Sequence, residues 1–118
     1  DGTDEFLISQ GSPYRIQAAQ WVAQAFDIEV DFIQLNFNQD AYEPIIGNEY
    51  DIVFCFSLLN WIHDKNRFLT YLSQFDQVIF EGHEAPQIEI ERFKTHGFTQ
   101  YRILGHADRG RTVIHFYK

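Results

Sequence analysis

Polar side chains able to bind a ligand or to move a proton follow several apolar segments of the chain. They are Gln10, Asn36, Ser57, Glu81 and, two residues further on, His83. Amide, hydroxyl and carboxylate groups form directed hydrogen bonds, and an imidazole exchanges a proton near neutral pH. If the apolar segments are parallel strands, their carboxyl ends meet at one edge of a sheet, where open α/β folds bind ligands. We therefore treat these positions as candidates for one binding site.

Metal and covalent chemistry find less support in these residues. Glu81 and His83 are of types that bind metals, but no third ligand follows at a recognisable spacing, so we predict no metal site. Cys55 has no adjacent base and no preceding helix N-terminus, so we expect a buried apolar side chain and not a nucleophile. The candidate residues suit ligand binding and general acid–base catalysis better.

The composition restricts the class of protein. With 118 residues, 45% of them hydrophobic and 22% charged, the chain is long enough for one globular domain and too short for two. The net charge of −8 and the isolated pair Arg109 and Arg111 argue against binding to a nucleic-acid backbone. No run of about 18 apolar residues is present, which argues against a membrane-spanning helix. A single cysteine and an acidic start without an apolar signal segment favour a cytoplasmic protein with a small-molecule or protein partner.

Changes in hydrophobic periodicity predict alternating strands and helices. The clearest strand is the apolar run from Ile52 to Phe56, and the clearest helix start is Ser12 followed by Pro13. We predict strands over residues 5–9, 29–35, 50–56, 77–80, 99–104 and 112–117. Helices are predicted over residues 13–26 and 64–75, and a third begins at Pro86 and ends before Gly97. Residues 36–48 are polar and are predicted to form a loop.

This alternation, closed by two strands joined through residues 105–111, predicts an α/β layered fold. Strands without polar breaks are typical of a mostly parallel sheet that is covered on both faces. The connection over residues 105–111 is too short for a crossover, so we expect the last two strands to form an antiparallel hairpin. All of residues 1–118 belong to this single predicted domain.

Three segments resemble the class I S-adenosylmethionine-dependent methyltransferases. Residues 50–64 read YDIVFCFSLLNWIHD and resemble the fourth strand of that family with the loop that follows it. Residues 6–13 resemble the end of the second strand, and residues 97–117 resemble the final antiparallel pair. Together these segments cover nearly the whole chain. The resemblance implies a Rossmann-like sheet.

Two features depart from that family. No G-x-G-x-G loop occurs, and the first strand of the family is missing together with its crossover helix. Gln10 stands where the family has an acidic residue that holds the cofactor ribose. The resemblance places the missing strand beside the fourth one, so its absence leaves a sheet edge open to another segment or another chain. We therefore expect a domain that is incomplete at its N-terminus, with this edge as the candidate site for a protein partner or for self-association.

The resemblance also assigns roles to the candidate residues. It places S-adenosyl-L-methionine against Gln10, Asn36, Phe37, Phe56 and Ser57. It places the substrate against Trp61, Glu81 and His83, and it makes His63 the general base for a hydroxyl acceptor. Structural roles remain open as well: Phe37 also suits the core, Trp61 also suits an anchor for the next helix, and His63 also suits the surface at a helix start.

Three functions are compatible with these features. The first is S-adenosylmethionine-dependent methyl transfer to a small-molecule or sugar-like acceptor, which requires the nucleophile, the methyl carbon and the sulfur to lie in line. The second is a non-catalytic, methyltransferase-like interaction module that has lost cofactor binding. The third, a different nucleotide-binding α/β domain, is disfavoured because the sequence has no glycine-rich loop for phosphates.

Overall fold

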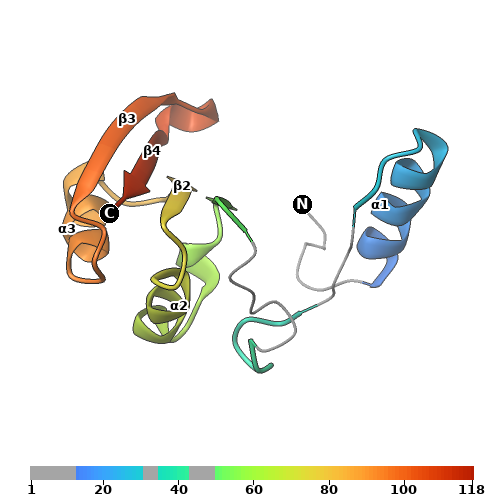
Figure 1. Cartoon of the computed structure of the whole chain (residues 1–118), viewed down its shortest axis with the longest axis horizontal. Helices are drawn as coiled ribbons and strands as arrows, with labels where there is room; N and C mark the ends of the chain where they lie inside the picture. The colour runs from blue at the N-terminus through green and yellow to red at the C-terminus, as the bar shows by residue number, and fades with distance from the viewer. Residues whose placement is uncertain (1–12, 31–34, 43–49) are drawn as a thin grey trace. The chain divides into compact units, whose positions relative to one another are not determined.

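The computed structural model describes residues 13–30, 35–42 and 50–118, and the chain divides into two compact units, Asp1–Ile46 and Gly47–Lys118. Figure 1 shows the elements of each unit, which are described separately. The predicted strand over residues 5–9, and Gln10 after it, lie outside the described residues. Most of the predicted strand over residues 29–35 also lies outside them, and its described ends, residues 29, 30 and 35, are not in a strand. The single domain over residues 1–118 stays a prediction.

The described part of the first unit contains the helix α1, over Pro13–Ala25, which confirms the helix predicted over residues 13–26. Its end is set by two backbone hydrogen bonds. The Ile28 N–H donates to the Ala23 carbonyl at 2.8 Å, and the Asp27 N–H donates to the Gln24 carbonyl at 3.2 Å. Asp27 has a φ of 56°, so this pattern is a Schellman motif with a left-handed residue after the helix.

The second unit is built on a four-stranded sheet in the order β1-β2-β4-β3 (Figure 1). Its strands are β1 (Val53–Phe56), β2 (Gln77–Glu81), β3 (Gln100–His106) and β4 (Thr112–Tyr117). The strands β1 and β2 are parallel, whereas β4 is antiparallel to both β2 and β3. Each strand matches a predicted one, and the antiparallel pairing of the last two strands is confirmed.

The prediction of a mostly parallel sheet is wrong for the described part of the chain. The strand β4 pairs with β2 on one side and with β3 on the other, so one hairpin contributes two antiparallel ladders. Only β1 and β2 remain parallel, joined through a helical crossover. The other strands expected to be parallel, over residues 5–9 and 29–35, lie wholly or largely outside the described residues. What the structure supports is a small α/β architecture with a mixed sheet and three helices.

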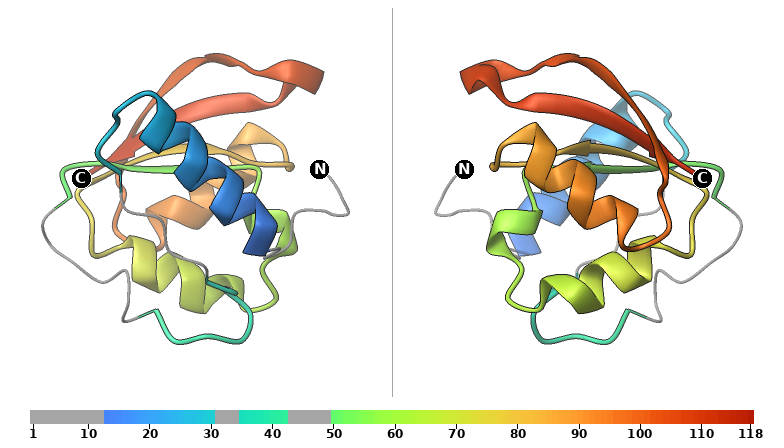
Figure 2. Two further views of the ribbon diagram at one scale, coloured as in Figure 1. Left: turned by 90° about the vertical axis from the view of Figure 1, so that its right-hand side faces the viewer. Right: turned by 90° about the vertical axis from the view of Figure 1, so that its left-hand side faces the viewer.

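The helices α2 (Lys65–Leu72) and α3 (Pro86–Lys94) lie on the same face of this sheet (Figure 2). Burial alternates along β2, where Val78 and Phe80 are buried and the residues between and beside them are half-buried. Phe54 and Phe56, whose side chains alternate with the buried Cys55, are 63% and 53% exposed. Within the second unit, the helices do not cover the face of β1 that carries these two rings, and the expected covering of both faces stays a prediction for the whole chain.

Phenylalanine rings form the core between α3 and the sheet. Phe93 stacks on Phe116 of β4 with ring centroids 4.0 Å apart, and its centroid lies 4.8 Å from that of Phe80 on β2. Phe98, which follows α3, meets Phe93 with a centroid distance of 5.7 Å. All four rings are buried. Burying large aromatic side chains is strongly favourable, so this cluster holds α3 and β4 against β2.

Local signals mark the helix ends in the second unit, and those predicted at Pro86 and Gly97 are confirmed. Asp64 caps α2, because its Oδ1 accepts a hydrogen bond from the Arg67 backbone N–H at 3.0 Å. Pro86 occupies the first turn of α3. Gly97 has a φ of 95°, and the Phe98 N–H after it donates to the Phe93 carbonyl at 3.1 Å, which ends α3.

We expect Phe93→Ala to lower the free energy of unfolding of the second unit by about 3–5 kcal/mol, because it leaves a cavity among packed rings. The matched control is Ile88→Ala on the same helix, where the side chain is 49% exposed and the expected loss is under about 1 kcal/mol. Urea unfolding followed by circular dichroism measures both. Equal losses for the two variants would contradict the packing described for Phe93.

Candidate functional site

Ser57 and Glu81 lie side by side where the two parallel strands end. Phe56 and Glu81 are register partners, and the Ser57 N–H continues the ladder by donating to the Glu81 carbonyl at 2.8 Å. The structure therefore brings together two of the positions chosen from the sequence as strand ends. Gln10 lies outside the described residues, and Asn36 belongs to the other unit.

Ser57, His83 and Arg111 form a hydrogen-bonded cluster at this edge. Arg111 Nη1 donates to Ser57 Oγ at 2.7 Å, and Ser57 Oγ lies 3.2 Å from His83 Nε2. The three residues come from different parts of the unit: Ser57 follows β1, His83 follows β2, and Arg111 precedes β4. Because Ser57 Oγ already accepts a hydrogen bond from Arg111, the Ser57 hydroxyl is able to donate a hydrogen bond to Nε2 of a neutral imidazole.

The backbone at Ser57 has a conformation that residues with a side chain seldom adopt. Its φ is 56°, in the left-handed region, and the chain turns there from β1 toward the short 3-10 helix η2 (Leu59–Trp61). The hydrogen bonds of its N–H and of its hydroxyl hold the residue in this conformation. Unfavourable backbone conformations often occur at functional sites, so Ser57 is a stronger candidate than its residue type alone suggests.

The surroundings of His83 favour the neutral imidazole. Burial lowers its pKa below the ordinary value of 6.5, the positive charges of Arg111 and Arg109 lower it further, and Glu81 acts in the opposite direction. Its Nδ1 is buried and has no hydrogen-bond partner among the described residues. In the arrangement above, the ring proton lies on Nδ1, so a donor at this edge is left without an acceptor.

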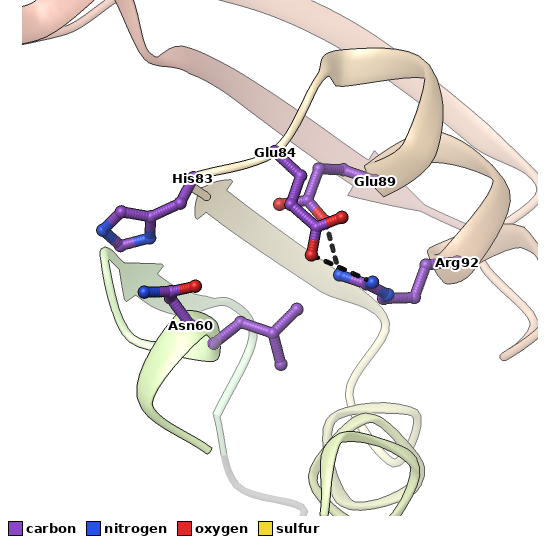
Figure 3. Close-up of a pocket in the computed structure, with 6 residues that line it drawn as sticks. Asn60, His83, Glu84, Glu89 and Arg92 are labelled. Carbon is purple, nitrogen blue, oxygen red and sulfur yellow. Dashed lines mark hydrogen bonds and ion pairs between the residues drawn. The ribbon is translucent and has the colours of Figure 1, made fainter. Parts of the chain in front are cut away.

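A shallow recess opens beside His83 (Figure 3). Its volume is about 150 Å³, open solvent at its mouth included, and it is lined by Leu59, Asn60, His83, Glu84, Glu89 and Arg92. Figure 3 shows the His83 ring above the Asn60 side chain on one side of the recess, with the charged residues on the other. Its surface dips too little to enclose even one water molecule, so it is far below the roughly 300–1,000 Å³ that is usual for small-molecule sites.

The charged side of the recess is satisfied internally. Arg92 donates to Glu89 Oε1 at 2.9 Å and to Glu84 Oε2 at 3.1 Å. Glu89 is buried, and this burial raises the pKa of its carboxyl, an effect that the charge of Arg92 opposes. Its carboxylate also packs against Gly82, where any side chain would collide with it. These contacts give the three charged residues a structural role.

Three further predicted site residues lie around the β1 end. Phe56 is exposed and stacks against Phe54, with ring centroids 5.8 Å apart. Trp61, the last residue of η2, is 57% exposed. His63 is exposed and lies between η2 and α2, directly before the Asp64 cap. Their assigned roles toward a cofactor and a substrate stay predictions.

Asn36 and Phe37 take part in a compact turn of the first unit. The Asn36 side-chain oxygen accepts a hydrogen bond from the Asn38 N–H at 2.9 Å, and the Asn36 N–H donates to Asp40 Oδ2 at 2.8 Å. Phe37 meets Tyr42 edge-on with ring centroids 5.5 Å apart, and the Tyr42 hydroxyl donates to the Phe37 carbonyl at 2.9 Å. Both residues therefore have local structural roles, whatever they bind.

Arg111 is the member of the cluster that the sequence did not place in the site. Together with Arg109 it was visible only as a pair of positive charges in the connection before the last strand. Its position immediately before the last strand could have indicated that it belongs to the site. That inference requires knowing that β4 pairs with β2 as well as with β3. That pairing brings Arg111 to Ser57, 54 residues away in the sequence.

Within the described ranges, no group of three or more His, Cys, Asp or Glu side chains is arranged to hold a metal ion. None of the helices in those ranges is both long and apolar enough to cross a membrane. Comparisons of the chain with protein-family models, with curated proteins and with solved structures found no match.

We expect Arg111→Gln to raise the pKa of His83 toward 6.5, because the substitution removes a positive charge that disfavours the imidazolium. The folded protein binds fewer protons at His83 than the unfolded chain, so His83 makes the free energy of unfolding fall as the pH drops below 6.5. The variant should weaken that pH dependence. Titration of the His83 ring by NMR measures the shift.

Arg102→Gln is the matched control, since it removes an exposed arginine of β3 that does not act on the His83 pKa. A His83 pKa that is unchanged in Arg111→Gln, or that rises equally in both variants, would contradict the cluster described above.

Proposed function

We propose that the chain is a methyltransferase-like domain of the S-adenosylmethionine-dependent class, and that the end of β1 and β2 is the side of its active site that faces the methyl acceptor. The observation that carries this proposal is the convergence of Ser57, Glu81 and His83 at the carboxyl ends of two parallel strands. Open α/β sheets bind their ligands at such ends.

The position of the last two strands gives further support. The resemblance implies a closing antiparallel pair added to parallel strands, and in the second unit the β3–β4 hairpin joins the sheet at β2. Under this proposal, β1 is the counterpart of the fourth strand of the family. A Rossmann-like sheet for the whole chain and a cytoplasmic location are parts of the same proposal.

The described residues at this edge fit an acceptor better than the whole methyl donor. The recess beside His83 is too small for a nucleoside, and its carboxylates are already paired with Arg92. The resemblance assigns the adenosine part of the donor to Gln10, Asn36 and Phe37, and that assignment stays a prediction. When bound, S-adenosyl-L-methionine supplies the methyl group, which passes to the acceptor by in-line displacement.

The residues of the second unit would position the acceptor and receive its proton. In the arrangement above, the basic nitrogen of the neutral His83 is Nε2, which faces Ser57 Oγ, and the lowered pKa keeps the ring neutral at physiological pH. Under this proposal, Ser57 takes the proton of the acceptor hydroxyl or amine and passes its own proton to Nε2. Ser57 supplies a hydroxyl whose position is fixed by Arg111. His63, the base implied by the resemblance, is the alternative proton acceptor at this end of β1.

Titration calorimetry with S-adenosylhomocysteine tests the proposal on the folded chain. We expect saturable heat, and we expect Gln10→Ala and Phe37→Ala each to weaken binding by about 1–3 kcal/mol, the size of a lost hydrogen bond or ring contact. Phe26→Ala is the control, because this ring lies in the same unit and is 73% exposed. The absence of heat from a folded sample at high ligand concentration would contradict donor binding.

The second candidate function is an interaction module, and the open edge of β1 favours it. Among the described strands, β1 pairs only with β2, and Phe54 and Phe56 on it are exposed. An unpaired strand edge with exposed aromatic side chains is a template for the addition of another strand. A second copy of the chain is the simplest partner for such an edge.

If this function holds, sedimentation should show a mass that increases with protein concentration, and Phe54→Lys should suppress the increase, because a charge at an edge opposes strand addition. Ile103→Lys is the matched control on β3, the strand at the other edge, where the side chain is 48% exposed. A monomer at all concentrations, or equal effects of the two variants, would contradict self-association through β1.

A further inference from the structure

We propose that Arg111 and Arg109 bind an anionic group, a phosphate or a carboxylate, of a small molecule at the carboxyl ends of β1 and β2. The anion site stands independently of methyl transfer. The assignment of the anionic group to the methyl acceptor rests on the function proposed above.

Arg111 has hydrogen-bond donors that nothing in the described chain uses. Its guanidinium carries five N–H donors, and the described contacts engage one of its terminal nitrogens, with Ser57 Oγ. No carboxylate of the described residues forms an ion pair with it, although the side chain is half-buried. The free N–H groups of this half-buried guanidinium are therefore available to the oxygen atoms of a ligand, which would replace water as their acceptor.

The guanidinium is also anchored at one of its terminal nitrogens. Ser57 Oγ accepts a hydrogen bond from Arg111 at 2.7 Å and lies 3.2 Å from His83 Nε2, so the Arg111 side chain is tied to the sheet edge at this hydroxyl. The unusual backbone conformation of Ser57 keeps this hydroxyl in place. Anchoring reduces the entropy lost when a ligand binds, and a guanidinium matches the paired oxygens of a phosphate or a carboxylate.

Arg109 adds a second positive charge to the same place. It lies in the 3-10 turn η3 (Asp108–Gly110) with a φ of 67°, is exposed, and is close enough to lower the pKa of His83. Within the described residues, neither Asp108 beside it nor Glu81 forms an ion pair with Arg109 or Arg111. The edge therefore presents two arginines that form no ion pair with any residue the structure describes.

The contrast with Arg92 shows that carboxylates are not scarce in this unit. Arg92 forms ion pairs with Glu84 at 3.1 Å and with Glu89 at 2.9 Å. The chain carries a net charge of −8, so acidic side chains outnumber basic ones, and arginines without an ion-pair partner among the described residues are unexpected. Two arginines are too few for a nucleic-acid backbone, which leaves a small anion as the ligand that this arrangement fits.

NMR titration of the full chain with sodium phosphate and with sodium acetate, each compared with sodium chloride at equal ionic strength, tests the site. We expect saturable shifts of the Ser57 amide, the His83 ring and the Arg111 side-chain signals. The anion that binds more tightly identifies the group as phosphate or carboxylate. Shifts that match those in sodium chloride would overturn the proposal.

Variants locate the binding. Arg111→Gln should weaken binding by about 10- to 100-fold, the usual effect of losing hydrogen bonds to a charged group. Arg111→Lys keeps the positive charge but loses the paired N–H donors of the guanidinium. Its affinity for the anion should lie between that of Arg111→Gln and that of the unmodified chain. Arg102→Gln, the exposed control on β3, should bind as the unmodified chain does. Equal weakening by Arg102→Gln and Arg111→Gln would overturn the proposal, because it would mean that only net charge matters.

S-adenosylhomocysteine titration of the same samples separates this inference from the proposed function. Phosphate or acetate binding without S-adenosylhomocysteine heat would support the anion site and contradict methyl-donor binding. S-adenosylhomocysteine heat without saturable anion shifts would support the proposed function and overturn the anion site.

Discussion

The placement of β4 beside β2 is the constraint on which the candidate site depends. It is held from one side by the stack of Phe93 on Phe116 and by the contact of Phe93 with Phe80. The ladder between the two strands runs from Gln77 and Tyr117 to Glu81 and Val113, so its last rung lies at the carboxyl end of β2. The residue two positions before Val113 is Arg111, which consequently reaches Ser57 at the end of β1. Core packing on one face of the sheet thus determines which charge stands at its edge.

The electrostatics of that edge follow from the same placement. Arg111 forms no ion pair with a carboxylate in the part of the chain that the structure describes, and its charge disfavours the protonated form of His83, which burial already opposes. The neutral ring is then able to accept the hydroxyl proton of Ser57 at a separation of 3.2 Å. Arg92, only nine residues after His83, shows the opposite case, because two glutamates neutralise it and it stays part of the framework. Arg92 and Arg111 are the same residue type, but their neighbours differ. Two glutamates bind Arg92, whereas Arg111 keeps N–H donors for a ligand.

Much of the second unit could be predicted from local signals. The Asp64 cap, Pro86 at a helix start and Gly97 at a helix end act within a few residues of their own positions, so the sequence shows them directly. The partners of a strand are not local in this sense. The hairpin could be foreseen from its short connection, but the insertion of its second strand next to β2 depends on contacts of Ile114 and Phe116 with residues far earlier in the chain. For this reason a mostly parallel sheet was expected and a mostly antiparallel one is found.

The sequence by itself determined which segments form strands and helices, and therefore that Ser57, Glu81 and His83 stand at or just after the ends of β1 and β2. It also determined the acidic balance and the aromatic content from which the core is made. Only the tertiary structure decided that Arg111 joins Ser57 and His83, that Ser57 takes a left-handed backbone conformation, and that Phe54 and Phe56 remain exposed. The physical reason is that strand ends follow from hydrophobic periodicity along the chain, whereas the charges and contacts around a side chain follow from which strands pair and which face the helices cover.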